Sequence, residues 1–219
     1  MHVANTRPSR AGWMHTLGAI GAILLPLAIL FSFFTSDDSG DTAAELIAYA
    51  KDHTTDAWVL QVIALTAPLL IGAFVASLRV RLRAANPAYQ ALTVIGGTLF
   101  VAFLGVGLTL WAAPLLSPDE LTTAGADAYL AFDDVGWVLL GMGGISIGAM
   151  IIAVSLAALE LGLVPKWAAW VSLLLGVVSL ATIVAVGIFA WAAWLLAAGL
   201  FLLLARDRAV PAVEAPAVA

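Results

Sequence analysis

The residues of this chain that could do chemistry stand just before two of its apolar segments. Asp52, His53 and Asp56 precede one segment, and Asp133 and Asp134 precede another. Brought together, their carboxylate oxygens and imidazole could hold Ca²⁺ or another divalent ion. Their spacing matches no established metal motif, however, and acids also favour helix N-termini because the helix dipole is positive there. The five residues are therefore weak candidates for an ion site, and we predict no metal or cofactor.

Inside the apolar segments the polar side chains are mild. The central parts contain no Asp, Glu, Lys, Arg or His, which proton relays, voltage sensors and intramembrane aspartic proteases require. Gln61 is the most notable polar residue there; it could line a cavity, although an interhelical hydrogen bond is the commoner role. The chain has no cysteine, which removes disulfides, thiolate metal sites and cysteine nucleophiles. We therefore predict that the protein is not an enzyme.

Composition indicates which solvent surrounds these segments. The 219 residues are 63% hydrophobic and 11% charged, with a mean hydropathy of +1.06. A bilayer is the expected solvent, and each crossing needs roughly 20 apolar residues. We predict an all-α fold, a polytopic membrane helical bundle with six transmembrane helices. The expected spans are 15–34, 57–78, 89–111, 137–159, 167–185 and 187–205.

The last two spans form one uninterrupted apolar run. From Trp167 to Ala205 the chain carries no charge, and a single helix of that length would rise ~58 Å, about twice the hydrocarbon thickness. The run must therefore fold back on itself. We place the break at 185–187, where Gly187 can supply turn backbone and several aromatic residues follow.

Charge predicts the orientation of the bundle. If the N-terminus is cytoplasmic, eight of the nine Lys and Arg residues lie inside, and eleven of the fourteen acids lie outside with Lys51. This is the positive-inside pattern. We expect a multi-pass protein of the cell (plasma or inner) membrane with both termini cytoplasmic. Its parts are a cytoplasmic N-terminal stub at 1–14, the transmembrane domain at 15–205 and a disordered cytoplasmic tail at 206–219.

Two outer loops carry the signature of short surface helices. Residues 42–45 (Thr-Ala-Ala-Glu) form a capping box, and residues 117–120 (Ser-Pro-Asp-Glu) repeat it with proline at the first helical position. Apolar residues then recur at helical spacing in both loops. We predict two short outer-surface amphipathic helices, each lying flat with its apolar side on the bundle or the lipid boundary.

Small residues in the fourth span predict close helix packing. Gly141, Gly144 and Gly148 lie there, and the last two form a GxxxG pair that lets helix backbones approach. Their neighbour could be another helix of this bundle, a second copy of the chain in a homo-oligomer, or a different membrane protein. Membrane lipids are the other expected partners. The net charge of -5 argues against nucleic acid.

Several short motifs carry a resemblance to a known group of proteins. They are a basic amino-terminal stub, LLPLAIL at 24–30, acidic outer loops with Ala-Tyr, Val-Pro-Lys-Trp at 164–167 and LLLAR at 202–206. In these features the chain resembles the small six-helix bacterial integral membrane proteins that form a domain-of-unknown-function family. The resemblance covers nearly the whole chain. It implies the six-helix architecture and supplies no catalytic residues.

Three function classes remain open. We favour a non-enzymatic membrane protein, either an accessory or interaction subunit or a binder of an apolar ligand within the bilayer. The alternative is a transporter or channel for a small neutral solute, with Gln61 and helix kinks at Pro26 and Pro68 as a polar pathway. A second alternative, a lipid-modifying membrane enzyme, would use interfacial acids such as Asp133 and Glu160 as acid or base.

Overall fold

The described part of the chain is helical. The computed structural model describes residues 10–35, 40–182 and 186–204, and these residues contain no strand. The all-α prediction is therefore confirmed for them. The α-helices are α1 (Arg10–Thr35), α2 (Ala43–Asp52), α3 (Thr54–Arg81), α4 (Pro87–Ala112), α5 (Thr123–Leu161), α6 (Lys166–Ser179) and α7 (Val186–Leu204), with short 3-10 helices η1 (Ala113–Leu115) and η2 (Pro118–Glu120) between α4 and α5.

Five of the described helices are long and apolar enough to cross a membrane. They are α1, α3, α4, α5 and α7, and they identify the chain as a multi-pass membrane protein. Helix α6 has 14 residues and rises only ~21 Å, less than the ~30 Å of a hydrocarbon core. Five of the six predicted spans therefore correspond to helices long enough to cross a membrane, and the predicted span 167–185 corresponds to the shorter α6. The predicted break falls partly on residues 183–185, outside the described part, and α7 begins at Val186.

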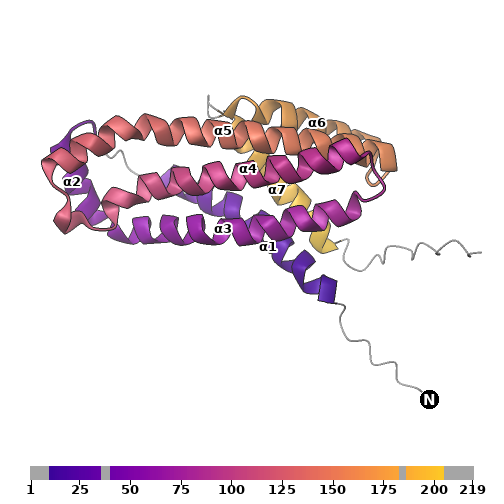
Figure 1. Ribbon diagram of the computed structural model, residues 1–219, viewed down its shortest axis with the longest axis horizontal. Helices are drawn as coiled ribbons and strands as arrows, with labels where there is room; N and C mark the ends of the chain where they lie inside the picture. Colours follow the sequence, from indigo (N-terminus) through magenta and orange to yellow (C-terminus); the bar gives the residue numbers. More distant parts are fainter. Residues whose placement is uncertain (1–9, 36–39, 183–185, 205–219) are drawn as a thin grey trace, which may run out of the picture.

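The helices form an elongated bundle. Helices α3, α4 and α5 run side by side along its length, with α2 across one end and α6 against α5 toward the other (Figure 1). Helix α1 packs against α3 and α7, and α7 also packs against α5 and α6. The interhelical contact between Arg81 and Phe201, 5.8 Å from guanidinium carbon to ring centroid, brings the end of α3 next to the end of α7.

Local sequence signals set most of the helix ends. Thr42 and Glu45 form the predicted capping box of α2, with the Thr42 hydroxyl accepting from the Glu45 amide at 3.3 Å. At the start of α4 the Asn86 side chain accepts from the Ala88 amide at 2.9 Å, and Pro87 is the first residue of the helix. Helix α5 ends at Gly162, whose φ of +62° is the left-handed conformation that favours glycine.

The second of the two predicted surface helices is wrong. Residues 118–120 form only the single turn η2, and Ser117 makes no capping bond. Instead Thr122 caps α5 by accepting from the Gly125 amide at 3.1 Å, and α5 continues without interruption into the fourth predicted span. A separate surface helix needs a break before that span, but no proline lies between Thr123 and Trp137, and α5 continues through Gly136.

The helices of two other predicted spans extend beyond the predicted boundaries. Helix α1 begins at Arg10, within the predicted stub, and α3 runs from Thr54 to Arg81, past both ends of the predicted segment 57–78. A helix does not stop where its apolar stretch stops, because polar residues at a membrane interface are also good helix formers. The predicted tail at 206–219 lies outside the described residues.

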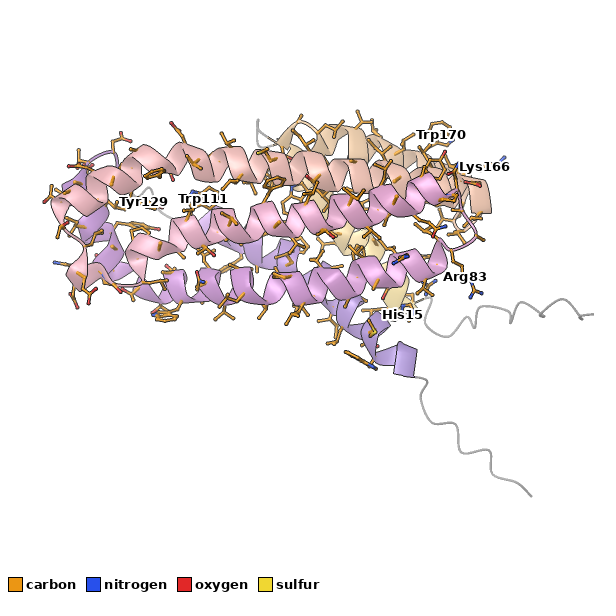
Figure 2. All side chains as sticks on the ribbon, viewed as in Figure 1. His15, Arg83, Trp111, Tyr129, Lys166 and Trp170 are labelled. Carbon is orange, nitrogen blue, oxygen red and sulfur yellow. The ribbon has the colours of Figure 1, made fainter. Side chains whose placement is uncertain are left out.

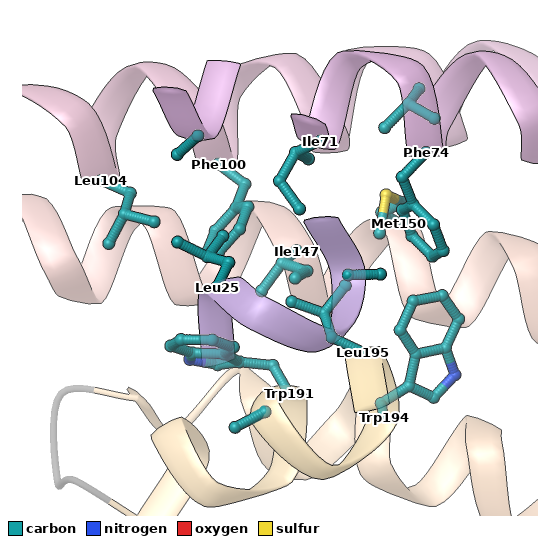
Figure 3. Packing of buried hydrophobic residues seen from close by; sticks show 14 of the residues in the cluster. Leu25, Ile71, Phe74, Phe100, Leu104, Ile147, Met150, Trp191, Trp194 and Leu195 are labelled. Atoms are coloured by element: carbon teal, nitrogen blue, oxygen red, sulfur yellow. The ribbon is translucent and has the colours of Figure 1, made fainter. Parts of the chain in front are cut away.

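Large aromatic side chains fill the centre of the bundle (Figure 3). The ring of Trp191 is fully buried and meets Phe100 edge-on, with 5.3 Å between ring centroids. Trp194 meets Phe74 in the same manner at 6.0 Å. Aliphatic residues from α1, α3, α5 and α7 complete the cluster, among them Leu25, Ile71, Ile147 and Leu195. These side chains pack against one another at the centre of the bundle.

The glycines predicted to mediate packing do so within the chain. A Cβ atom at Gly148 would lie 2.9 Å from the Gly176 carbonyl oxygen and 2.8 Å from Leu180, so α5 and α6 are in backbone contact there. At Gly144 the added atom would collide with Thr182, and Gly141 is buried. The small-residue face of α5 is thus occupied by the segment that includes α6.

Candidate functional site

The five predicted ion ligands lie at the α2 end of the bundle but do not assemble into a site. Among the described residues, no group of three His, Asp or Glu side chains is placed to hold a metal ion. Asp52 ends α2 and Asp56 lies in the first turn of α3, whereas Asp133 and Asp134 lie on α5. The first pair therefore belongs to a helix junction, and the second pair to a continuous helix.

His53 has a structural role at that junction. It is the only residue between α2 and α3, and its backbone leaves the helical conformation (φ −114°, ψ 20°). The ring stacks on Tyr49 with 3.9 Å between centroids, and its Nδ1 lies 2.9 Å from the Tyr49 carbonyl oxygen, to which it can donate. The Thr54 hydroxyl donates to the Ala50 carbonyl at 3.1 Å. The Tyr49 carbonyl also accepts from the His53 amide at 3.0 Å, so side-chain and backbone bonds together hold the junction.

A shallow hollow of about 570 Å³ lies beside this junction. It is lined by Lys51 and Thr54 together with the loop that contains η2. None of the five predicted ion ligands lines it. The hollow is polar and opens at the end of the bundle that carries most of the acids.

Gln61 lies partly buried on α3, and its Oε1 has no hydrogen-bond partner. It does not line the groove described below. Neither of the roles considered for it, cavity lining or interhelical bonding, is therefore visible among the described contacts.

Three helices are joined by a hydrogen-bond chain that the sequence did not reveal. The Trp194 indole N–H of α7 donates to the Ser172 hydroxyl of α6 at 2.6 Å, and Ser172 lies 2.6 Å from the Ser155 hydroxyl of α5. Ser155 itself donates to the Ile151 carbonyl at 2.7 Å. Because Ser155 uses its one proton for the Ile151 carbonyl, Ser172 is the donor in its hydrogen bond with Ser155. Every proton in the chain has one acceptor, which makes it a structural link.

A groove of about 830 Å³ lies between α3 and α4. Its volume is within the roughly 300–1,000 Å³ of small-molecule sites. The apolar part is lined by Pro68, Gly72 and Val75 of α3 and by residues of α4 that include Gly97 and Val101. All lining residues come from these two helices and the turn that joins them, so the groove lies on the flank of the bundle.

Two glycines shape the groove in opposite ways. A Cβ atom at Gly97 would collide with Val75, so Gly97 lets α4 approach α3 closely. At Gly72 an added Cβ atom would have no atom within 4 Å, so that position faces open space. The close approach of α4 to α3 at Gly97 forms the floor of the groove, and the absence of a side chain at Gly72 widens it.

One end of the groove is polar and positively charged. Arg79 and Arg83 line it there and are exposed, and Gln90 lies opposite on α4. The Gln90 amide nitrogen donates to the carbonyl oxygens of Arg83 at 3.3 Å and Ala85 at 3.0 Å. This side chain therefore fixes the turn that carries Arg83.

The polar end of the groove coincides with the basic end of the bundle. Arg83, Lys166 and His15 lie toward one end, and Trp111 and Tyr129 toward the other (Figure 2). The acidic residues of α2, η2 and the first half of α5 belong to the end opposite Arg83. The division of charge predicted from the sequence is thus a division between the two ends of the described bundle.

A signal in the sequence could have found this groove. The α3 lining residues recur at helical spacing, as do those of α4, so each set forms one stripe along its helix. The α3 stripe consists of Pro68, Gly72, Val75, Ala76, Arg79 and Val80, and Arg83 continues it in the turn that follows. Small and β-branched residues that end in two arginines are unusual for a packed interface. Which helix lies opposite that stripe is not encoded in the spacing.

Comparisons with protein-family models, with curated proteins and with solved structures find no match. The suggested membership of a domain-of-unknown-function family therefore stays a prediction, and function has to be inferred from the residues of this chain.

Proposed function

We propose that this protein is a non-enzymatic integral membrane protein that binds an apolar ligand from the bilayer in the groove between α3 and α4. The groove itself carries the proposal. It opens on the flank of the bundle, its lining is mostly apolar, and Gly72 leaves room in it. A ligand dissolved in the bilayer can enter such a groove sideways without passing through water.

The packed aromatic cluster supports binding at the surface over conduction through the centre. A solute pathway would need a polar, open interior, and the described centre contains Trp191, Phe74 and Phe100 packed together. Of the residues considered for such a pathway, Pro68 lines the groove, whereas Gln61 does not. The transporter alternative therefore has less support than ligand binding.

The buried hydroxyl groups support a non-enzymatic role. Among the described residues, the buried polar side chains are all Ser or Thr, and each donates to a backbone carbonyl one turn earlier in its own segment. A hydroxyl so engaged is a poor nucleophile, because catalysis needs a base close to it. The six residues are Ser77, Thr93, Ser146, Ser155, Ser179 and Thr182.

The same proposal includes six crossings with both termini in the cytoplasm. Helix α6 would contribute the sixth crossing together with the residues that follow it, and the basic end that carries Arg83 and Lys166 would face the cytoplasm. The chain contains no cysteine, so single cysteines can report the side. Lys166→Cys and Arg208→Cys should react with a membrane-impermeant maleimide only after cells are permeabilised, and Glu120→Cys should react in intact cells. Labelling of Arg208→Cys from outside would contradict six crossings.

Ligand binding is tested by counting bound lipids. Protein purified from membranes in mild detergent is examined by native mass spectrometry, before and after Gly72→Phe. We expect the wild-type protein to retain a lipid-sized ligand and the variant to lose it, because the phenyl ring fills the open space next to Gly72. Ala102→Phe is the matched control, since Ala102 is exposed on α4 outside the groove. Equal occupancy in all three proteins would contradict the proposal.

A further inference from the structure

Resting on the ligand-binding function proposed above, we infer that the ligand is an anionic phospholipid of the leaflet at the basic end of the bundle. Its acyl chain lies along the apolar stripe of α3 and α4, and its phosphate lies between Arg79 and Arg83. The groove combines these two chemistries in one continuous surface.

The length of the apolar part fits one leaflet. The stretch of α3 from Pro68 to Arg79 rises ~17 Å, close to the ~15 Å that is half of a ~30 Å hydrocarbon core. A chain that starts at the headgroup level beside Arg79 would therefore reach Pro68 near the middle of the bilayer. The groove is matched to a membrane lipid in its ordinary orientation.

Arg79 and Arg83 bind the negatively charged phosphate of the lipid in this proposal. Arg79 and Arg83 are four residues apart, both are exposed, and both line the groove. No ion pair of either side chain is found within the described part of the chain. A guanidinium presents several N–H donors in a plane and binds a phosphate through two of them. Basic pockets between transmembrane helices on the cytoplasmic side are suited to anionic headgroups for this reason.

The neighbouring arginine has a different role. Arg81 is partly buried, and its guanidinium lies over the Phe201 ring of α7 at 5.8 Å. Of the three arginines at this end of α3 and in the turn after it, only Arg79 and Arg83 line the groove. Arg81 and Lys166 thus serve as controls of equal charge at the same end.

The test compares two lipids that differ only in headgroup. Full-length protein, stripped of lipid in detergent, is titrated with dioleoyl phosphatidylglycerol or dioleoyl phosphatidylcholine and followed by native mass spectrometry. We expect the wild-type protein to prefer the anionic lipid. Arg79→Gln with Arg83→Gln should weaken its binding roughly 30-fold, at about 1 kcal/mol for each basic residue, and leave the neutral lipid unchanged. Arg81→Gln with Lys166→Gln should keep most of the preference, as should Arg79→Lys with Arg83→Lys.

Each outcome separates the two claims. If both lipids bind equally to the wild-type protein and both are lost in Gly72→Phe, ligand binding stands and the anionic ligand is wrong. If the two charge-removing pairs reduce the preference equally, the effect is one of total charge and the site between Arg79 and Arg83 is wrong. If Gly72→Phe changes neither lipid, both claims fail. A change of oligomeric state in Gly72→Phe at constant lipid occupancy would assign the groove to a protein helix and overturn the inference.

Discussion

Glycines in two regions of this bundle have opposite surroundings. At Gly18 an added Cβ atom would lie 2.6 Å from the Phe74 backbone nitrogen, and at Gly148 it would lie 2.9 Å from the Gly176 carbonyl oxygen. At Gly72 it would meet nothing within 4 Å. Gly18 and Gly148 let backbones pack together in the interior, whereas Gly72 leaves space in the α3–α4 groove. In a bilayer lipid fills such space, and the proposed ligand would lie there.

Truncating a side chain at the centre of the packed interior should cause the largest loss in the free energy of unfolding. Trp191→Ala should lower the free energy of unfolding by about 3–5 kcal/mol, because the fully buried indole leaves a cavity that its neighbours cannot fill. Reversible unfolding in mixed micelles measures this. Trp167→Ala is the control, since that side chain is 72% exposed, and it should change stability little. A loss under about 1 kcal/mol at Trp191 would show that the interior is loosely packed.

Bulk added at a close contact should also destabilise the bundle. Gly18→Leu should cost about 1–3 kcal/mol, because the new side chain must push α1 away from the α3 backbone. The same change at Gly72 should cause no loss of stability, since the position is open and leucine favours the helix more than glycine does. Thermal unfolding of the two variants, in the same detergent, tests the comparison directly. Equal destabilisation by both would remove the distinction between interior and groove.

The hydrogen-bond chain across α5, α6 and α7 should contribute less. Ser172→Ala leaves the Trp194 indole N–H without its acceptor, and we expect a loss of about 1–2 kcal/mol in the free energy of unfolding. Ser77→Ala removes a buried hydroxyl that bonds only within its own helix, so its loss should stay below about 0.5 kcal/mol. Replacing Trp194 by Phe together with Ser172→Ala should restore part of the stability. A larger loss for Ser77→Ala would contradict the proposed link.

The smallest effect should be a gain. Gly72→Ala should stabilise the protein by about 0.4–1 kcal/mol, because alanine favours the helix and its methyl meets no atom. A single methyl also leaves most of the groove open, so lipid occupancy should be retained. Unfolding and native mass spectrometry on the same sample measure both quantities. Destabilisation would indicate that the helix backbone near Pro68 is arranged differently from the description given above.

Much of the fold was predictable because helix signals are local. The capping box at Thr42 and Glu45 was read directly and formed as expected. The same pattern at 117–120 failed, because a capping box needs a helix behind it and Thr122 begins that helix instead. Sequence spacing shows that a helix starts in this region, but it does not show whether Ser117 or Thr122 is the N-cap. The predicted span 167–185 begins next to the start of α6, but α6 ends at Ser179, because hydropathy measures apolar length and gives no helix end.

The candidate site was much harder to predict. Asp133, Asp134 and His53 were singled out for their chemistry, yet His53 is held by Tyr49 and the acids remain apart. The stripe along each of α3 and α4 is visible in the spacing, but the spacing does not show that the two stripes lie side by side. Arg79 and Arg83 were counted for orientation alone, because their shared stripe with Gly72 has meaning only once α4 lies beside it.

The most direct test of the central claim locates the lipid on the protein. Phosphatidylglycerol with a photoactivatable acyl chain is incorporated into membranes that contain the protein, crosslinked, and mapped by peptide mass spectrometry. We predict adducts concentrated on the groove residues between Pro68 and Arg83 and between Gln90 and Val101. They should disappear in Gly72→Phe and persist in Ala102→Phe. Adducts spread evenly over all lipid-facing helices, including the exposed Leu174 of α6, would contradict a specific lipid site.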